Sequence, residues 1–196
     1  MLGFTTVPEL TGTQFFIVYN ALSFVIAAFL ASFVFFLVAR NNLSEKYKGA
    51  MIVSALVVLI AGYHYFRIFE SFEAAVLGNG IFNDAYRYMD WLLTVPLLMV
   101  ELVAVLAVTG AAKAKMLTKL SVAAALMIIL GYPGELALPN PDGTWADGVM
   151  ESRLIWGTLS TIPFVYILYV LWVELGKTFQ QETGQVRVLL RNTRLL

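Results

Sequence analysis

The stretch RYMDWLLTVPLLMVE, residues 87–101, combines the apolar character of a membrane-spanning helix with three charged side chains. These are Arg87, Asp90 and Glu101, and most of the remaining residues are Leu, Val or Met. A charged side chain near the centre of a bilayer costs about 2.5–3.5 kcal/mol on insertion scales. Such a residue needs a partner, water or a neutralising proton. The stretch therefore predicts both a transmembrane helix and a buried polar site.

The polar residues of this stretch share one helix face. At about 100° per residue, Arg87, Asp90, Thr94 and Glu101 fall within a wedge roughly 60° wide, with Trp91 beside it. Asp90 and Glu101 are eleven residues apart in the sequence, which is about 16 Å along a helix. Two interpretations remain open: structural ion pairs between helices, or two acids that pass protons. Two acids, an arginine and a threonine on one face favour the second.

Composition indicates that the chain lies in a membrane. Apolar residues make up 60% of it and charged residues 13%, whereas soluble domains have about 45–50% and 25%. Five apolar runs predict helices that cross a bilayer, which takes roughly 20 residues: residues 15–39, 50–69, 85–112, 117–132 and 154–175. A sixth is predicted to begin at residue 186. We expect an all-α, multi-pass transmembrane helix bundle, a single C-terminally incomplete domain over residues 1–196.

Several kinds of site are excluded by residue content. Without cysteine, the chain has neither disulfide nor thiolate chemistry, and its single histidine cannot build a multi-histidine metal site. There is no glycine-rich phosphate loop and no basic face suited to nucleic acid. We therefore expect no bound metal and no nucleic-acid partner.

Charges between the apolar runs predict the orientation. Basic residues follow the first, third and fifth runs: Arg40, Lys46 and Lys48; Lys113, Lys115 and Lys119; Lys177, Arg187, Arg191 and Arg194. Acidic residues occupy the alternate connections: Glu70, Glu73 and Asp84; Glu135, Asp142, Asp147 and Glu151. Because basic loops stay cytoplasmic, the N-terminus is predicted to be extracellular and the protein to lie in the cell membrane. Residues 132–148, rich in Pro and Gly, predict an extracellular turn or short hairpin.

Four motifs stand out in the sequence: DAYRYMDWLLTVP (84–96), AGYHYFRI (61–68), LGYPGE (130–135) and LSTIPFVYILY (159–169). Together they resemble motifs of the microbial rhodopsins, and they are most similar to the proteorhodopsin and xanthorhodopsin group of proton pumps. The resemblance implies seven helices around all-trans retinal, which a lysine of the seventh helix holds as a Schiff base. It implies a light-driven ion transporter, not an enzyme, that exports protons. It also implies a homo-oligomer, a pentamer or hexamer.

The resemblance also implies roles for the polar residues. Asp90 would be the counterion and proton acceptor, and Glu101 the proton donor. Thr94 would lie between them, and Arg87 below the counterion. His64 would pair with Asp90, although a lone membrane histidine is often only a packing residue.

A retinal pocket is implied as well. Its wall would contain eight residues, for which ordinary helix packing is the alternative: Trp91, Leu98, Met127, Gly131, Trp156, Ser160, Thr161 and Phe164. Leucine at position 98 resembles the choice in green-absorbing proteorhodopsins. All six lysines fall in predicted loops or at predicted helix ends, so the retinal lysine is expected beyond Leu196.

Gly157 has two interpretations. It could open a gap in the pocket wall that admits the end ring of a carotenoid, a xanthophyll antenna, or it could permit close helix packing.

Two other functions remain as alternatives to a pump. One is a sensory rhodopsin that signals to a partner protein, and the other is a non-photochemical membrane fragment. Glu101 favours the pump, because sensors commonly lack a carboxylic donor.

Overall fold

The computed structural model describes residues 10–80, 82–83, 85–105, 110–136 and 148–181. These residues form five α-helices: α1 (Gly12–Ala39), α2 (Glu45–Val76), α3 (Tyr86–Val105), α4 (Gly110–Glu135) and α5 (Val149–Gln181). A short 3-10 helix, η1 (Arg40–Asn42), joins α1 to α2. Within these ranges there is no β-strand, so the prediction of an all-α chain is confirmed.

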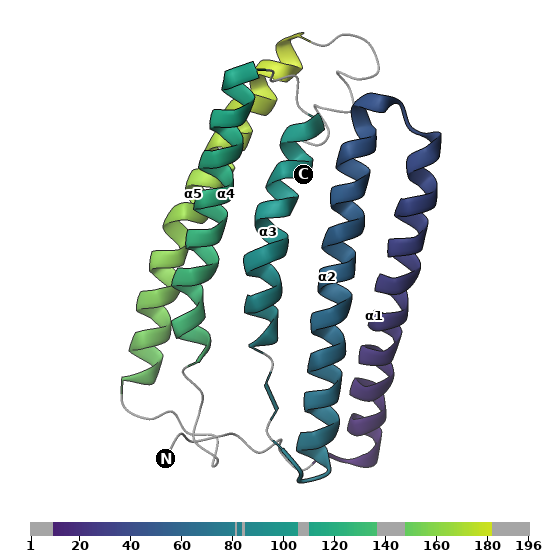
Figure 1. Cartoon of the computed structure of the whole chain (residues 1–196). Helices are drawn as coiled ribbons and strands as arrows, with labels where there is room; N and C mark the ends of the chain where they lie inside the picture. The colour runs from purple at the N-terminus through teal and green to yellow at the C-terminus, as the bar shows by residue number, and fades with distance from the viewer. Residues whose placement is uncertain (1–9, 81, 84, 106–109, 137–147, 182–196) are drawn as a thin grey trace.

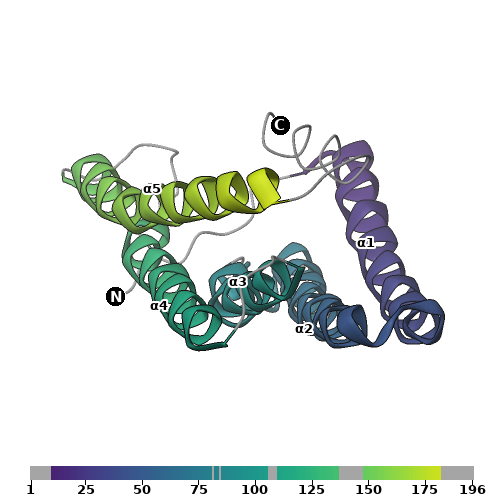
Figure 2. The same ribbon diagram turned by 90° about the horizontal axis from the view of Figure 1, so that it is seen from above.

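The five helices stand in one curved row, each antiparallel to the next (Figures 1 and 2). Each helix packs against its neighbours in sequence, and the end helices α1 and α5 do not touch in the described part of the chain. Seen from above, the row bends so that α5 and α1 flank its concave side (Figure 2). Every inner helix therefore has two packed sides and two open faces, one concave and one convex.

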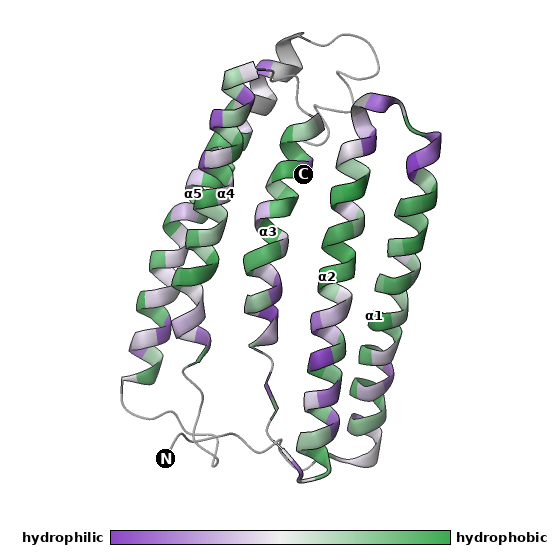
Figure 3. Ribbon diagram, viewed as in Figure 1, coloured by the Kyte–Doolittle hydropathy of each residue, from purple (hydrophilic) through white to green (hydrophobic). Residues whose placement is uncertain are grey.

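Four of the helices are long and apolar enough to cross a membrane. The candidate spans are Gly12–Asn42, Tyr47–Val76, Gly110–Glu135 and Val149–Val173. Hydrophobic residues cover most of α1, and hydrophilic residues gather toward the helix ends (Figure 3). α3 has 20 residues, long enough to cross, but it carries three charged side chains. The buried polar side chains of the described residues, Asp90 and Thr94, both lie on this helix, which stands in the middle of the row.

Helices α1, α2 and α5 extend beyond their predicted bounds of 15–39, 50–69 and 154–175. Apolar runs predict the part of a helix inside lipid, whereas capping groups decide where the helix ends. At the start of α1, the Thr11 hydroxyl accepts a hydrogen bond from the Gln14 amide, 3.3 Å away, and the Gln14 side chain accepts one from the Thr11 amide at 3.0 Å. This capping box satisfies backbone donors that would otherwise lack partners.

The predicted boundary between the third and fourth helices, 85–112 and 117–132, is wrong. α3 ends at Val105, and α4 already begins at Gly110. The φ angle of Gly110 is +60°, in the left-handed region that a helix cannot continue through. Because the sequence around Gly110 is apolar, hydropathy alone could not locate the boundary between the two helices.

Two predicted connections are also corrected. Lys113, Lys115 and Lys119 lie on α4 and not in a loop, with Lys119 more than two turns from the start of the helix. The predicted turn over 132–148 begins too early, since α4 runs through Pro133 to Glu135. Residues 137–147, and the sixth helix predicted from residue 186, lie outside the described residues.

An apolar core joins α3, α4 and α5. It is built from Val103, Met116, Leu120, Ala123, Ala124 and Ile167, all buried. On the other side of the row, α1 approaches α2 closely, and a Cβ added at Gly62 would lie 3.2 Å from the Cβ of Phe29. These two packed regions hold the α2–α3 interface between them.

Candidate functional site

The polar face of α3 is turned toward α2. His64 and Ser54 of α2 are ten residues apart, and Asp90 and Glu101 of α3 are eleven apart. Since the two helices are antiparallel, His64 meets Asp90 and Ser54 meets Glu101. The interface thus holds two acidic positions, separated by about 16 Å along the helix.

Glu101 is hydrogen-bonded across this interface. The Ser54 hydroxyl donates to Glu101 Oε1 at 2.7 Å, and both side chains are partly buried. The same hydroxyl lies 3.2 Å from the backbone carbonyl of Ala50. Because a hydroxyl has one proton, these two contacts share it unless Glu101 is itself protonated and donates to Ser54.

Asp90 is the most deeply placed acid of the site, only 4% exposed. Its Oδ1 is the one buried side-chain oxygen without a hydrogen-bond partner in the described part of the chain. His64 Nδ1 lies 3.9 Å from this oxygen, which is too long for a hydrogen bond. A buried acceptor without a donor is costly unless something else supplies the donor, so Asp90 has capacity for a cationic or proton-bearing partner.

The neighbours of Asp90 are oriented by backbone contacts. His64 Nδ1 lies 3.0 Å from the carbonyl oxygen of Ile60, and since a carbonyl can only accept, Nδ1 carries the hydrogen in this bond. The Thr94 hydroxyl donates to the backbone carbonyl of Asp90 itself, at 2.9 Å. Both contacts fix side chains beside the carboxylate while leaving its Oδ1 unsatisfied.

Arg87 belongs to a charge network at the end of the bundle where α3 begins. Its guanidinium lies 3.4 Å from Glu135 Oε1 at the end of α4. Arg153 of α5 lies 3.8 Å from the other oxygen of Glu135. One carboxylate therefore links three helices near the Asp90 end of the polar face.

The residues predicted to line a retinal pocket lie on three helices. Trp91 and Leu98, on one open face of α3, are 37% and 41% exposed. Thr161 and Phe164 are exposed on α5, and among the described residues no Cα atom of α3 lies within 8 Å of one of α5. These side chains therefore lie on separate open faces and do not form a closed wall.

Gly131 and Trp156 lie in packed positions between helices. A Cβ added at Gly131 would lie 3.2 Å from the Tyr88 ring and 3.7 Å from Ser160 Cβ. The Trp156 Cβ lies 3.3 Å from the Cβ position of Gly134. Met127, the remaining predicted residue, is half-buried on α4. Glycine at 131 thus has a structural reason here, which is to make room for the Tyr88 ring.

Gly157 is exposed, and a Cβ added there would meet no described atom within 4 Å. Its carbonyl accepts hydrogen bonds from the hydroxyls of Thr161, at 2.8 Å, and Ser160, at 3.2 Å. Among the described helices, close packing therefore does not explain this glycine.

Three residues of the site were not singled out from the sequence. Ser54 could have been found from the sequence, because it lies ten residues from His64 on α2 and Glu101 lies eleven from Asp90 on α3. In two antiparallel helices, such similar spacings bring both pairs together. Tyr88, whose ring centroid lies 5.2 Å from that of Trp91, gave no signal in the sequence. Glu135 was assigned only to an acidic loop, because its pairing with two arginines depends on how three helices meet.

Comparisons with known proteins agree with this architecture. Residues 14–196 match the family model described as "Bacteriorhodopsin-like protein". The green-light absorbing proteorhodopsin of Gamma-proteobacterium EBAC31A08 is 35% identical over 162 residues. That alignment covers 82% of this chain and 59% of the proteorhodopsin, so the chain spans little more than half of its relative's length.

Solved structures give the same result. The crystallographic structure of xanthorhodopsin, "a Light-Driven Ion Pump with Dual Chromophore", is 52% identical with a TM-score of 0.83, and the match covers 96% of this chain and 75% of that one. A thermophilic rhodopsin is 48% identical, with the same TM-score and coverage. On its helical fold, its matched residues and these identities, the chain belongs to the bacteriorhodopsin-like family of membrane proteins.

Proposed function

We propose that the full-length protein is a light-driven outward proton pump that uses retinal. The observation that carries this proposal is the pair of acids on one face of α3, each beside a polar side chain of α2. Asp90 is buried with one unsatisfied oxygen, and Glu101 is hydrogen-bonded to Ser54. Two acids in different surroundings can take up and release a proton in a fixed order.

The outward direction rests on charge distribution. All described lysines lie toward the end of the bundle where α2 and α4 begin and α5 ends: Lys46, Lys48, Lys113, Lys115, Lys119 and Lys177. Placing this end in the cytoplasm puts the N-terminus outside. Asp90 then lies nearer the extracellular side and Glu101 nearer the cytoplasm, as export requires.

The residues present fit the protein's side of a retinal site. Asp90 Oδ1, buried without a donor, suits a neighbouring cation. Trp91 and Leu98 on α3, with Phe164 on α5, offer apolar surface on open helix faces. Retinal, when bound through a lysine nitrogen, would absorb the light. The protonated nitrogen would supply the positive charge and the proton that is transferred. No described lysine lies near Asp90.

Within this proposal each acid has a defined task. Asp90 takes up a proton at its unsatisfied oxygen. The side chains of Thr94 and His64, each held by a backbone carbonyl, stay in place beside this carboxyl group. Glu101 holds a proton at rest, with the Ser54 hydroxyl at its Oε1, and gives it up toward the centre of the membrane. A carboxylic donor at this position favours a pump over a light sensor, since a sensor has no need to be reprotonated quickly.

Acidification measurements test the function. The full-length protein, expressed with all-trans retinal in cells or liposomes, should acidify the outside on illumination, and an uncoupler should abolish the signal. A coloured, photoactive protein that moves no protons would contradict the pump and favour the sensor. The pentamer or hexamer implied by the family resemblance stays a prediction, which native mass spectrometry of the same sample would check.

We also propose that Gly157 admits the end ring of a carotenoid. Its support is that Gly157 is exposed and has open space beside it among the described residues. The related xanthorhodopsin, 52% identical, is described as having a dual chromophore. A ring lying against apolar side chains here would be stabilised by van der Waals packing, since the lipid that it leaves is as apolar as these side chains.

Gly157→Trp is expected to abolish carotenoid binding and leave pumping intact, because the indole fills the open space. The measurement is the action spectrum of pumping with a hydroxylated or ketolated carotenoid added. Ile155→Trp is the matched control, since Ile155 lies about 200° around α5 and carries the same bulk on another face. If the Gly157 protein gains no blue shoulder with any xanthophyll, the antenna proposal is wrong.

His64→Asn is expected to change the pH at which the colour of the retinal-bound protein titrates. The imidazole lies 3.9 Å from Asp90 Oδ1, so replacing it alters the electrostatic surroundings of the carboxylate. Tyr65→Phe on the same helix is the control, since Tyr65 packs against Phe29 of α1. A titration that overlays the wild type would assign His64 to packing alone.

A further inference from the structure

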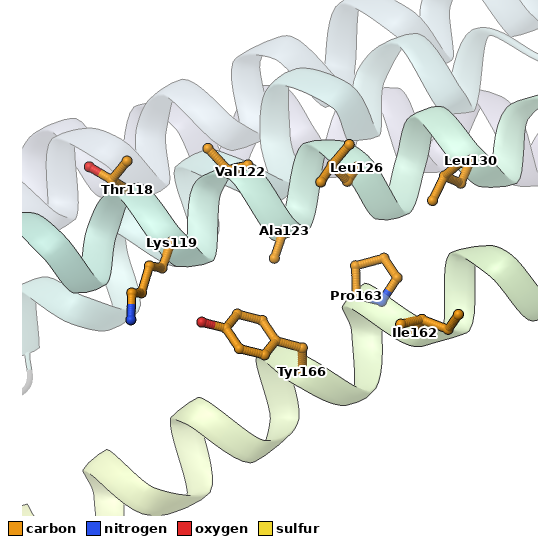
Figure 4. A pocket seen from close by; sticks show the side chains of 9 residues that line it. All are labelled: Thr118, Lys119, Val122, Ala123, Leu126, Leu130, Ile162, Pro163 and Tyr166. Carbon is orange, nitrogen blue, oxygen red and sulfur yellow. The ribbon is translucent and has the colours of Figure 1, made fainter.

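A groove runs between α4 and α5 (Figure 4). Its wider part has a volume of about 590 Å³, and a second part of about 330 Å³ continues from it. Lys119 and Tyr166 line both parts, so the two form one continuous groove.

The groove faces away from the proposed retinal site. On α4, the groove residue Val122 is nine residues before Gly131, which places it about half a turn around the helix. On α5, the groove residue Ile162 lies about 200° from Phe164. The groove is therefore on the convex side of the row, where a transmembrane bundle meets lipid.

The wide part of the groove is apolar and open. Val122, Leu126 and Leu130 line it from α4, and Ile162 and Pro163 from α5. Val122 is 53% exposed and Ile162 64%. From Thr118 to Leu130 the groove follows α4 for about 18 Å, close to the thickness of one leaflet, about half of a 30 Å hydrocarbon core. These dimensions fit an acyl chain.

The narrow part has a different chemistry. Lys115 and Lys119 line it from α4, and Tyr166 and Tyr169 from α5. α4 has 26 residues, more than the roughly 20 needed to cross, so its first turns reach the headgroup region. Lysine extends its ammonium along apolar surface to the interface, and tyrosine is enriched at the same depth. Ammonium and hydroxyl groups at this end can donate to phosphate oxygens.

We propose that this groove binds one anionic phospholipid, with an acyl chain against Val122, Leu126 and Ile162 and its phosphate at Lys115 and Lys119. The charge at the narrow end favours an anionic headgroup over a zwitterionic one. It also favours lipid over a second copy of the chain, because a two-fold contact through this face would bring the same lysines together. The site depends only on the membrane-embedded fold and not on retinal.

Native mass spectrometry of the full-length protein in mild detergent tests the proposal. It is titrated with phosphatidylglycerol and with phosphatidylcholine of the same acyl chains. We expect tighter binding of phosphatidylglycerol, and the double variant Lys115→Gln, Lys119→Gln should weaken it about 30-fold and remove the preference. Lys113→Gln removes one charge two residues from Lys115, at a position that does not line the groove. It is the control for charge lost outside the groove and should keep the preference.

A second variant tests the apolar part. Val122→Trp fills the groove without changing charge, and it should reduce binding of both lipids while Lys113→Gln does not. Phosphatidylglycerol that binds the double lysine variant as tightly as the wild type would overturn the proposal. So would an equal loss in the Lys113 control, or a lipid-free dimer that Val122→Trp dissociates.

Discussion

Replacing Asp90 by Asn is expected to abolish proton export by the full-length, retinal-bound protein and to shift its absorption to longer wavelength. An amide cannot take up the proton, so transport should fall by about 100-fold or more, the scale of losing a general base. The colour shift follows because the negative charge that stabilises a nearby cation is lost. The fold should survive, since a neutral amide of the same shape costs less to bury than a carboxylate.

The measurements are light-driven acidification and the visible spectrum of the same preparation. Asp90→Glu is the matched control, because it keeps a carboxyl group at this position and should retain measurable transport. Acidification at the wild-type level in Asp90→Asn would show that Asp90 is not the acceptor, whatever the spectrum does.

Glu101→Gln is expected to leave the colour nearly unchanged and to slow recovery after a flash by about 100-fold. Glutamine keeps the size of the side chain and can still bond with Ser54, but it has no acidic proton to give. Recovery should then depend on the external pH, and a small proton carrier such as azide should accelerate it. Time-resolved absorption after a laser flash measures these rates.

Ser54→Ala separates the role of the acid from that of its partner. It removes the 2.7 Å hydrogen bond to Glu101 and keeps the carboxyl group, so recovery should change by only about 3–10-fold, the kinetic equivalent of one hydrogen bond. Glu101→Asp should likewise recover faster than Glu101→Gln. If Glu101→Gln recovers at the wild-type rate, the donor is another group.

The sequence predicted the fold class because lipid leaves few alternatives. A backbone in hydrocarbon must satisfy its own hydrogen bonds, so long apolar runs become helices. The five helices and the single polar face of α3 follow from that rule and from helical periodicity. The division between α3 and α4 did not follow, since it depends on Gly110 at φ +60° inside an apolar segment.

The placement of the acids shows what the sequence alone determined about this protein. Periodicity put Asp90 and Glu101 on one face, and the family resemblance suggested their roles and a pairing of Asp90 with His64 of the second helix, but neither named a partner for Glu101. Only the tertiary structure decided that Ser54 bonds to Glu101 and that Asp90 keeps an oxygen without a donor. It also decided that Arg87 pairs with Glu135 on α4. Helical periodicity determines the direction in which a side chain points from the axis of its own helix. The partner of that side chain depends on how a second helix is rotated and packed, and residues distant in the sequence determine this.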